Sequence, residues 1–184
     1  MTSKITPAPD GLERVRQFVN TLDIEEGTDA LADSDGARRW LEDSLFVTET
    51  VGDEELSYLR TIRRALRDAL AANHAGDELS NETLGILNRA TEAAQISPEL
   101  EGRAVRLVPR VAGIEGAVGL LLVEMIEAMR SSTWRRLKIC GNDSCQWAFY
   151  DRSPARSAKW CSMSICGNRT KQQAFRERHL ASSE

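Results

Sequence analysis

Apolar side chains recur at intervals of three and four residues along much of the first 130 positions. This spacing places them on one face of an α-helix, so amphipathic helices are predicted near residues 12–22 and 56–74. Gly76 can end the second helix, and Ser80 can cap a third one that runs through residues 84–95. The two apolar stripes consist of Leu12, Val15, Phe18, Val19 and Leu22, and of Leu56, Leu59, Ile62, Leu66 and Leu70.

The pattern changes in three further segments. The acidic, turn-rich stretch DIEEGTDALADSDG, residues 23–36, is expected to be a surface loop before a helix from Arg38 to Phe46. AVRLVP, residues 104–109, alternates apolar and polar positions and predicts a small β-hairpin with the PEL segment before it. Residues 113–130 form the most apolar predicted helix, whose apolar face we expect to be buried within its own domain. That face consists of Ile114, Val118, Leu121, Leu122, Met125 and Ile126.

The last quarter of the chain reads as a separate small module. WAFY, residues 147–150, alternates like a short strand, with Trp147 and Phe149 on one face, and a helix is predicted over residues 167–179. Residues 126–139 contain no Pro or Gly, so a flexible linker is not expected between the two parts. We therefore predict a mainly α fold with a small β-hairpin, in which a helical N-terminal domain of residues 1–130 precedes a ββα-like module of residues 131–184.

Charge supports this division. Although the whole chain has a net charge of −4 at pH 7, residues 131–184 carry +6 and residues 1–130 carry −10. A basic end on an acidic body points to a polyanionic partner. Six of the ten aromatic residues also lie in the basic part, where packing in a small core is favoured over stacking on bases as their role.

All four cysteines lie in the basic part, as two pairs with the same spacing. CGNDSC, residues 140–145, and CSMSIC, residues 161–166, are separated by fifteen residues, and Gly-Asn follows one cysteine of each pair. Clustered thiols in a reducing compartment are more often metal ligands than disulfides, and four thiolates match a closed tetrahedral zinc site. The Gly-Asn pairs are expected to adopt the left-handed conformation that aims backbone N–H groups at sulfur. The predicted ligands of one structural Zn²⁺, which would stabilise the ββα-like module, are Cys140, Cys145, Cys161 and Cys166.

Two disulfides, or four core cysteines, are the alternatives to zinc, but unconnected core cysteines have no reason to share one spacing. A catalytic zinc is not expected, because four thiolates leave no position for water. No P-loop, dinucleotide-binding, H-E-x-x-H or G-x-S-x-G motif occurs in the sequence, so the chain is predicted not to be an enzyme. It has no apolar stretch suited to a signal peptide or a membrane helix, so no membrane association and a cytoplasmic location are expected.

CGNR, residues 166–169, together with CSMSI before it and FYDRSPARSAKWC before that, closely resembles the CGNR zinc finger family. The resemblance covers about residues 137–178. In that family the finger typically follows a helical domain called ABATE, assigned to stress-induced transcription regulators. FVNTLD, residues 18–23, resembles the start of that domain, although ERVRQ replaces its usual leucine-rich lead. The resemblance implies that the protein binds zinc and DNA.

The predicted C-terminal helix offers a candidate DNA-reading face. Arginine can bind guanine, and glutamine can bind adenine, through two hydrogen bonds, so a face that carries both residue types could read the major groove. Other basic residues are candidates for phosphate contacts, which set position rather than sequence. The reading face would consist of Arg169, Gln172, Gln173 and Arg176, and the phosphate contacts of Arg152, Arg156, Lys159 and Lys171. A solvated helix face is the alternative, and Arg169 could instead neutralise the thiolates or pair with Asp151.

Two functions follow from these patterns. The first is a transcription regulator whose C-terminal finger contacts DNA and whose N-terminal domain senses a signal or dimerises. The second is a zinc-stabilised adaptor that binds an acidic protein without reading DNA. DNA is thus the expected partner, with a homodimer and a small-molecule effector as further candidates. Candidates for lining an effector pocket are Asn20, Thr21, Arg63 and Arg67, although solvation of the helix surface explains the arginines equally well.

Overall fold

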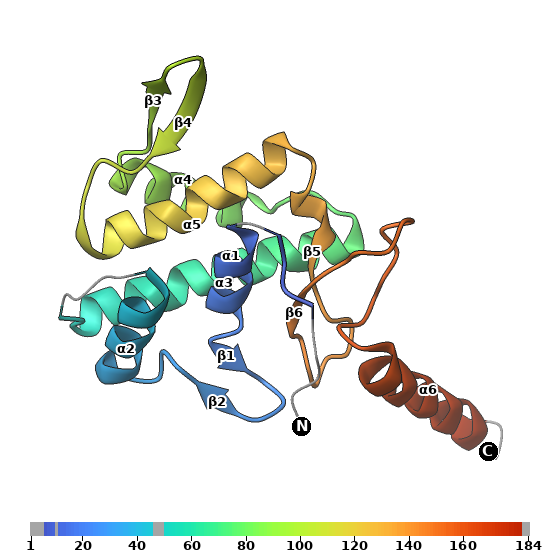
Figure 1. The fold of residues 1–184 in the computed structure, drawn as a ribbon. Coiled ribbons are helices and arrows are strands. Elements are labelled where there is room, and N and C mark those ends of the chain that lie inside the picture. Colours follow the sequence, from blue (N-terminus) through green and yellow to red (C-terminus); the bar gives the residue numbers. More distant parts are fainter. Residues whose placement is uncertain (1–5, 10, 46–49, 182–184) are drawn as a thin grey trace.

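The computed structural model describes residues 6–9, 11–45 and 50–181, and it leaves out the side chains at 174 and 177–181. Figure 1 shows a mainly helical body from which one β-hairpin and one terminal helix project. The helices in the described part are α1 (Leu12–Val19), α2 (Ser34–Leu45), α3 (Asp53–Ala75), α4 (Asn81–Ala93), α5 (Gly113–Arg130) and α6 (Asn168–Ala181). The strands form three antiparallel pairs, which are β1 (Leu22–Asp23) with β2 (Thr28–Asp29), β3 (Ser97–Glu101) with β4 (Ala104–Val108), and β5 (Leu137–Ile139) with β6 (Ala148–Tyr150). This arrangement confirms the predicted fold class.

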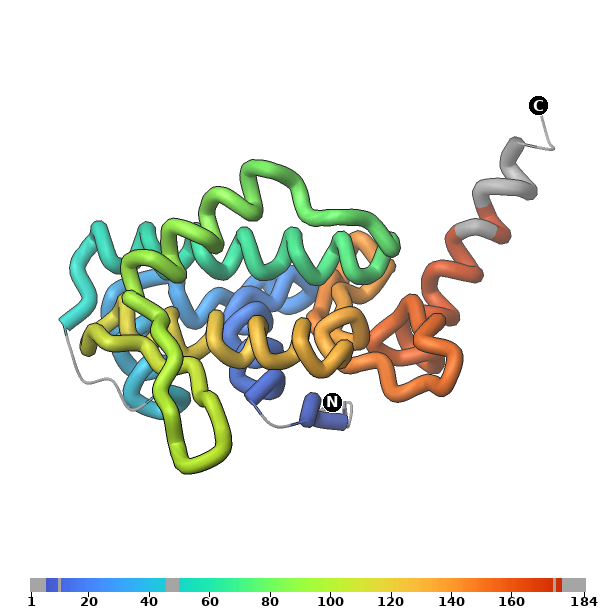
Figure 2. The backbone as a smooth tube through the Cα atoms, turned by 90° about the horizontal axis from the view of Figure 1, so that it is seen from above, coloured from blue at the N-terminus to red at the C-terminus, as the bar shows by residue number. Residues whose placement is uncertain are grey.

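Helix α3 runs through the middle of the body, where α1, α2, α4 and α5 pack against it (Figures 1 and 2). Its predicted apolar stripe is buried, and Gly76 ends the helix in the left-handed conformation with φ 86°. Ser80 caps α4 as predicted, because its hydroxyl accepts a hydrogen bond of 3.1 Å from the backbone N–H of Thr83. Helix α5 also buries its predicted face within this core, apart from the half-buried Ile126.

The segment between α1 and α2 differs from the sequence prediction. Helix α1 ends at Val19, and Leu22 belongs to β1 rather than to the helix. The expected surface loop contains the β1–β2 hairpin and the fully buried Leu31, and α2 begins at Ser34 instead of Arg38. Phe46, the predicted end of that helix, lies outside the described residues. The hairpin is stabilised by a contact between residues far apart in the sequence, because Asp29 on β2 pairs with the Arg63 guanidinium on α3. Such a contact produces no periodic pattern in the sequence.

The C-terminal part shares a core with the helices. Strand β5 packs on α3, and it pairs with β6 so that Lys138 lies opposite Phe149. A short 3₁₀ turn, η1 (Trp134–Arg136), joins α5 to β5. Buried side chains of this region that belong to the main core are Trp134, Leu137, Ile139 and Ala148. The main core contains residues from both sides of position 130. The division of the chain into two domains at that position therefore remains a prediction.

Candidate metal centre and nucleic-acid interface

The four cysteines meet at the end of the β5–β6 pair. Their Sγ atoms all lie within 4.8 Å of one another, and the Cys145–Cys161 and Cys161–Cys166 pairs are each separated by 3.7 Å. Cys140 directly follows β5, whereas Cys166 lies in a short π-helical turn, η2 (Met163–Gly167), that leads into α6. Three of the thiols are buried, and Cys161 is partly exposed. All four atoms are therefore close enough to bind a single metal ion.

The two glycines after Cys140 and Cys166 have a different role from the one predicted. Among the described residues, positive φ angles near this site occur at Gln146 and Arg156 instead of at Gly141 or Gly167. A Cβ atom on Gly141 would lie 3.0 Å from the His74 ring, and one on Gly167 would lie 2.6 Å from the sulfur of Met163. At both positions glycine leaves room for neighbouring side chains that approach the backbone closely, and neither glycine adopts the left-handed conformation.

The chemistry of the thiols favours a bound cation. Hydrogen bonds from the thiols of Cys145 and Cys161 lower the pKa of Cys140 to about 2, so this residue holds the first negative charge. The hydrogen bond to Cys140 raises the pKa of Cys145 to about 12. Hydrogen bonds to Cys140 and Cys145 likewise raise the pKa of Cys161. Further thiolates are thus opposed by the first one unless a cation shares the site. The donor set fits a metal ion that prefers four sulfur ligands.

An aromatic layer packs around the cysteines. Phe149 is buried against them, and Trp147 and Trp160 pack on the same cluster while they remain partly exposed. This is the packing role that the sequence favoured for the aromatic residues. Phe175 on α6 differs, since 54% of it is exposed.

Asn20 attaches the metal module to the helical body. Its side-chain amide donates a hydrogen bond of 2.9 Å to the Ala148 carbonyl, and its side-chain carbonyl accepts one of 2.7 Å from the Ala148 N–H. Asn20 therefore takes the place of a further strand beside β6. Arg67 on α3 adds a second tie, because it donates to the carbonyls of Gln146, Val19 and Leu22.

The four candidates for an effector pocket have separate positions. Asn20 and Thr21 line a hollow of about 470 Å³ together with Trp40 and Trp147. Arg63 and Arg67 are not among the residues that line this hollow, and they make structural contacts instead. The sequence did not predict the pairing of Asn20 with β6, although the FVNTLD motif drew attention to this residue.

Replacing Asn20 by alanine is expected to lower the free energy of unfolding by about 1 to 3 kcal/mol, because the N–H and C=O of Ala148 would lose their partners. Urea unfolding measures the loss, and faster amide exchange at Ala148 would locate it on β6. Asn88→Ala, an exposed asparagine on α4, is the matched control and should change stability by less than about 0.5 kcal/mol. Equal stability of both variants would show that Asn20 does not hold the module.

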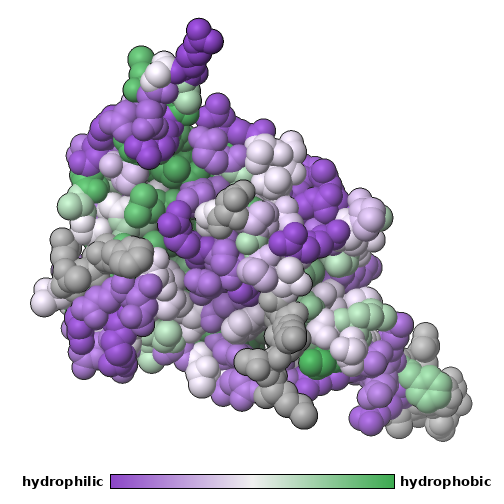
Figure 3. Space-filling view, viewed as in Figure 1, coloured by the Kyte–Doolittle hydropathy of each residue, from purple (hydrophilic) through white to green (hydrophobic). Residues whose placement is uncertain are grey.

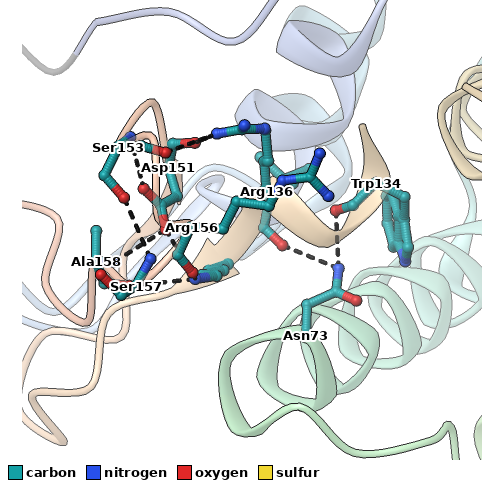
Figure 4. Close-up of polar contacts among 10 residues, drawn as sticks. Asn73, Trp134, Arg136, Asp151, Ser153, Arg156, Ser157 and Ala158 are labelled. Atoms are coloured by element: carbon teal, nitrogen blue, oxygen red, sulfur yellow. Dashed lines mark hydrogen bonds and ion pairs between the residues drawn. The ribbon is translucent and has the colours of Figure 1, made fainter. Parts of the chain in front are cut away.

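A buried ion pair organises the loop between the two cysteine pairs. Lys138 on β5 donates to the Asp151 carboxylate at 2.8 Å and to the Arg156 carbonyl at 2.6 Å. The same carboxylate accepts hydrogen bonds from the backbone N–H groups of Ser153 and Ala158, each at 2.9 Å (Figure 4). Burial alone would raise the pKa of Asp151, but these hydrogen bonds outweigh it and hold the pKa below its ordinary value. Arg169 therefore does not pair with Asp151, contrary to one of the alternatives that the sequence left open.

The residues of the predicted reading face line one hollow, which we call the reader hollow. It has a volume of about 360 Å³ and is lined by Asn142, Ser144, Arg169, Gln172, Gln173 and Arg176. The hollow lies at the start of α6, and α6 projects from the body in both views (Figures 1 and 2). The side chain of Arg169 pairs with Glu25, in the loop between β1 and β2. The structure thus brings the four predicted side chains together, while their contact with DNA remains a prediction.

The four predicted phosphate contacts come from different parts of the metal module, and their contact with DNA remains a prediction. Arg152 donates to the Pro7 carbonyl at 2.7 Å and lies over the Tyr150 ring. Arg156 lines a groove beside Trp134, whereas Lys159 and Lys171 are exposed. Of these four residues, Lys171 is the one that shares α6 with the reader hollow.

Two family comparisons cover most of the chain. Residues 13–131 match ABATE, described as "Putative stress-induced transcription regulator", and residues 136–179 match the CGNR zinc finger. A comparison with curated proteins found no match. Within the described part of the chain, none of the helices has the length and apolar character needed to span a membrane.

Proposed function

The chain belongs to the ABATE family and ends in a CGNR zinc finger, and from this premise we propose that it is a zinc-dependent, DNA-binding transcription regulator. The single observation that carries the proposal is the reader hollow, where two arginines and two glutamines are held next to the metal centre on a projecting helix. Zinc supplies structural cross-linking in this proposal, and α6 supplies the contacts to DNA.

Zinc is the metal that fits the donor set best. Four cysteine sulfurs that converge on one point match the closed tetrahedral sites in which zinc stabilises small modules. The proposal includes no enzymatic activity, because such a site leaves no coordination position for a reacting water. It places the protein in the cytoplasm, where reduced thiols remain available for metal binding.

The geometry of α6 supports insertion into a DNA groove. A helix fits the major groove only if other parts of the protein leave its sides accessible, and α6 meets this condition because it extends beyond the body. Arg176 and Gln172 would read bases, and Lys171 would contact a phosphate. Signal sensing by residues 1–130 would reach α6 through the rigid ties at Asn20 and Arg67.

An adaptor function is supported by one specific contact. Arg169 pairs with the Glu25 carboxylate, so the basic face can accept an acidic side chain as well as a phosphate. A partner protein with an acidic segment would present the same group. Salt dependence and competition by mixed DNA separate the two functions, because DNA binding releases condensed counterions in proportion to the phosphates contacted.

Replacing Arg176 by alanine is expected to weaken binding to a selected DNA site by about 1 to 3 kcal/mol and to relax the preference at one base pair. Lys171→Ala should weaken binding to all sequences alike and reduce the slope of log K against log salt by about one. Selection from random DNA with the zinc-loaded protein would give the site, and fluorescence anisotropy at several salt concentrations would give both quantities.

Arg89→Ala is the matched control, because Arg89 is an exposed arginine on α4, away from the reader hollow. It should bind DNA as the parent protein does, and none of the three variants should lose zinc. If Arg176→Ala and Lys171→Ala also bind DNA like the parent protein, α6 is a solvated helix and the adaptor function replaces DNA binding.

A further inference from the structure

One face of the β3–β4 hairpin is apolar and uncovered. In the observed register Leu100 lies opposite Val105, and Pro98 lies opposite Leu107, so these four side chains share one face. Leu100 is 81% exposed and Val105 is 52% exposed. Figure 3 shows hydrophobic residues gathered at this projecting hairpin and at its base.

The other face of the hairpin is charged, and its charges are satisfied within the chain. Glu99 accepts from Arg106 at 3.4 Å and from Arg110 at 3.1 Å, and Glu101 lies 3.8 Å from Arg106. The hydrogen bonds from Arg110 and Arg106 hold the pKa of Glu99 below its ordinary value. The apolar face is therefore the side of the hairpin that is left to contact another surface.

A groove with apolar side chains in its lining lies at the C-terminal end of α5. It has a volume of about 610 Å³ and is bounded by the half-exposed Leu84 and Met129, with Leu79 and the buried Trp134 beside them. Asp77, Glu78, Arg135 and Arg156 also line it. Among the described residues, these four charged side chains take part in no ion pair, and neither does Arg103 at the tip of the hairpin.

The hairpin cannot reach the groove of its own chain. Helix α5 separates them, and its eighteen residues span about 27 Å, whereas five-residue strands extend for about 17 Å. A second copy turned end for end would bring each hairpin to the other copy's groove. Because both contacts are then equivalent, the pair closes as a two-fold dimer.

We propose that the protein forms a homodimer in which the apolar tip of each β3–β4 hairpin inserts into the groove beside Trp134 of the second copy. Leu100 and Val105 fill the apolar floor of the groove. Arg103 meets Asp77 and Glu78, the two acidic residues of the groove. The dimer presents two copies of α6, and its formation does not require DNA.

The test is sedimentation of the full-length, zinc-loaded protein without DNA at about 100 µM, where a dimer with a micromolar Kd is fully populated. Leu100→Asp and Leu84→Asp should each weaken the dimer by at least about 30-fold per contact, because each places a charge in an apolar contact and both contacts of the variant dimer carry the change. Both positions are exposed in the monomer, so both variants should fold. Leu120→Asp is the matched control, since Leu120 is 38% exposed on α5, compared with 39% for Leu84, and lies outside the groove.

A mixture of the two disrupting variants tests the hairpin-to-groove geometry. The Leu84→Asp chain keeps an intact hairpin and the Leu100→Asp chain keeps an intact groove, so mixing them should give a heterodimer although each alone is monomeric. A monomeric parent protein, an intact dimer in either single variant, a mixture without heterodimer, or loss of the dimer in Leu120→Asp would each overturn the proposal. DNA binding by α6 would stand in all four cases.

Discussion

Replacing Cys161 by serine is expected to abolish metal binding and to unfold the segment from Cys140 to the beginning of α6, while α1 to α5 stay folded. Three thiolates without their fourth partner cannot close the tetrahedral site, and a structural zinc contributes about 10 to 16 kcal/mol to the folding of comparable modules. Native mass spectrometry would show the loss of one metal ion per chain. Limited proteolysis would show new cleavage sites between residues 140 and 169, and circular dichroism would keep most of its helical signal.

Ser162→Ala is the control for this substitution, because Ser162 neighbours Cys161 and its hydroxyl contacts only Ser164 among the described residues. It should retain the metal and resist the protease. A chelator should reproduce the Cys161→Ser result on the parent protein. Metal-free protein with a protease-resistant tail would contradict the assignment of a structural metal centre.

Replacing Asp151 by alanine is expected to lower the free energy of unfolding by about 3 to 5 kcal/mol, because it leaves the Lys138 ammonium buried without its counterion. Lys138 and Asp151 are only 6% and 1% exposed, so water cannot replace the lost carboxylate without opening the loop. Urea unfolding at neutral pH measures the effect. Glu127→Ala removes the exposed ion pair with Arg130 and serves as the control, with an expected change of about 0 to 1 kcal/mol.

The same pair predicts a pH dependence with a definite sign. Because the pKa of Asp151 is lower in the folded protein than in the unfolded chain, the pair stabilises the fold fully above the ordinary carboxyl pKa of about 3.9. That contribution is lost as the pH falls through the lower, folded pKa. The difference in stability between the parent protein and Asp151→Ala should therefore shrink in acid, and a constant difference down to pH 2 would contradict this account.

The elements that the sequence predicted are those whose signal is local. The stripe from Leu56 to Leu70 repeats at helical spacing because α3 buries one face along its length, and the alternation in residues 104–109 reflects the two faces of β4. The equal spacing of the cysteines likewise predicted that they would meet. In each case a short stretch of chain contains the whole pattern.

The elements that the sequence missed depend on contacts between distant residues. Strand β5 has three residues, too few to show a period, and it exists because it pairs with β6 and packs on α3. Asn20 lies 128 positions before Ala148, its partner. Lys138 reads as one more basic residue in a basic tail, whereas in the fold it is buried with Asp151. The contacts of Arg152 with the Pro7 carbonyl and the Tyr150 ring likewise leave no local pattern in the sequence.

The joint between the helices and the β5–β6 pair limits how this finger can be reused. Trp134, Leu137 and Ile139 belong to the same core as α1 and α3, and Asn20 supplies hydrogen bonds to the N–H and C=O of Ala148. A fusion that grafts residues 131–184 onto a foreign protein would strip those apolar side chains of their neighbours and expose them to water. The finger therefore depends on the body to which it is joined, and a chimera that exchanges it between related chains must carry the matching helical body along with it.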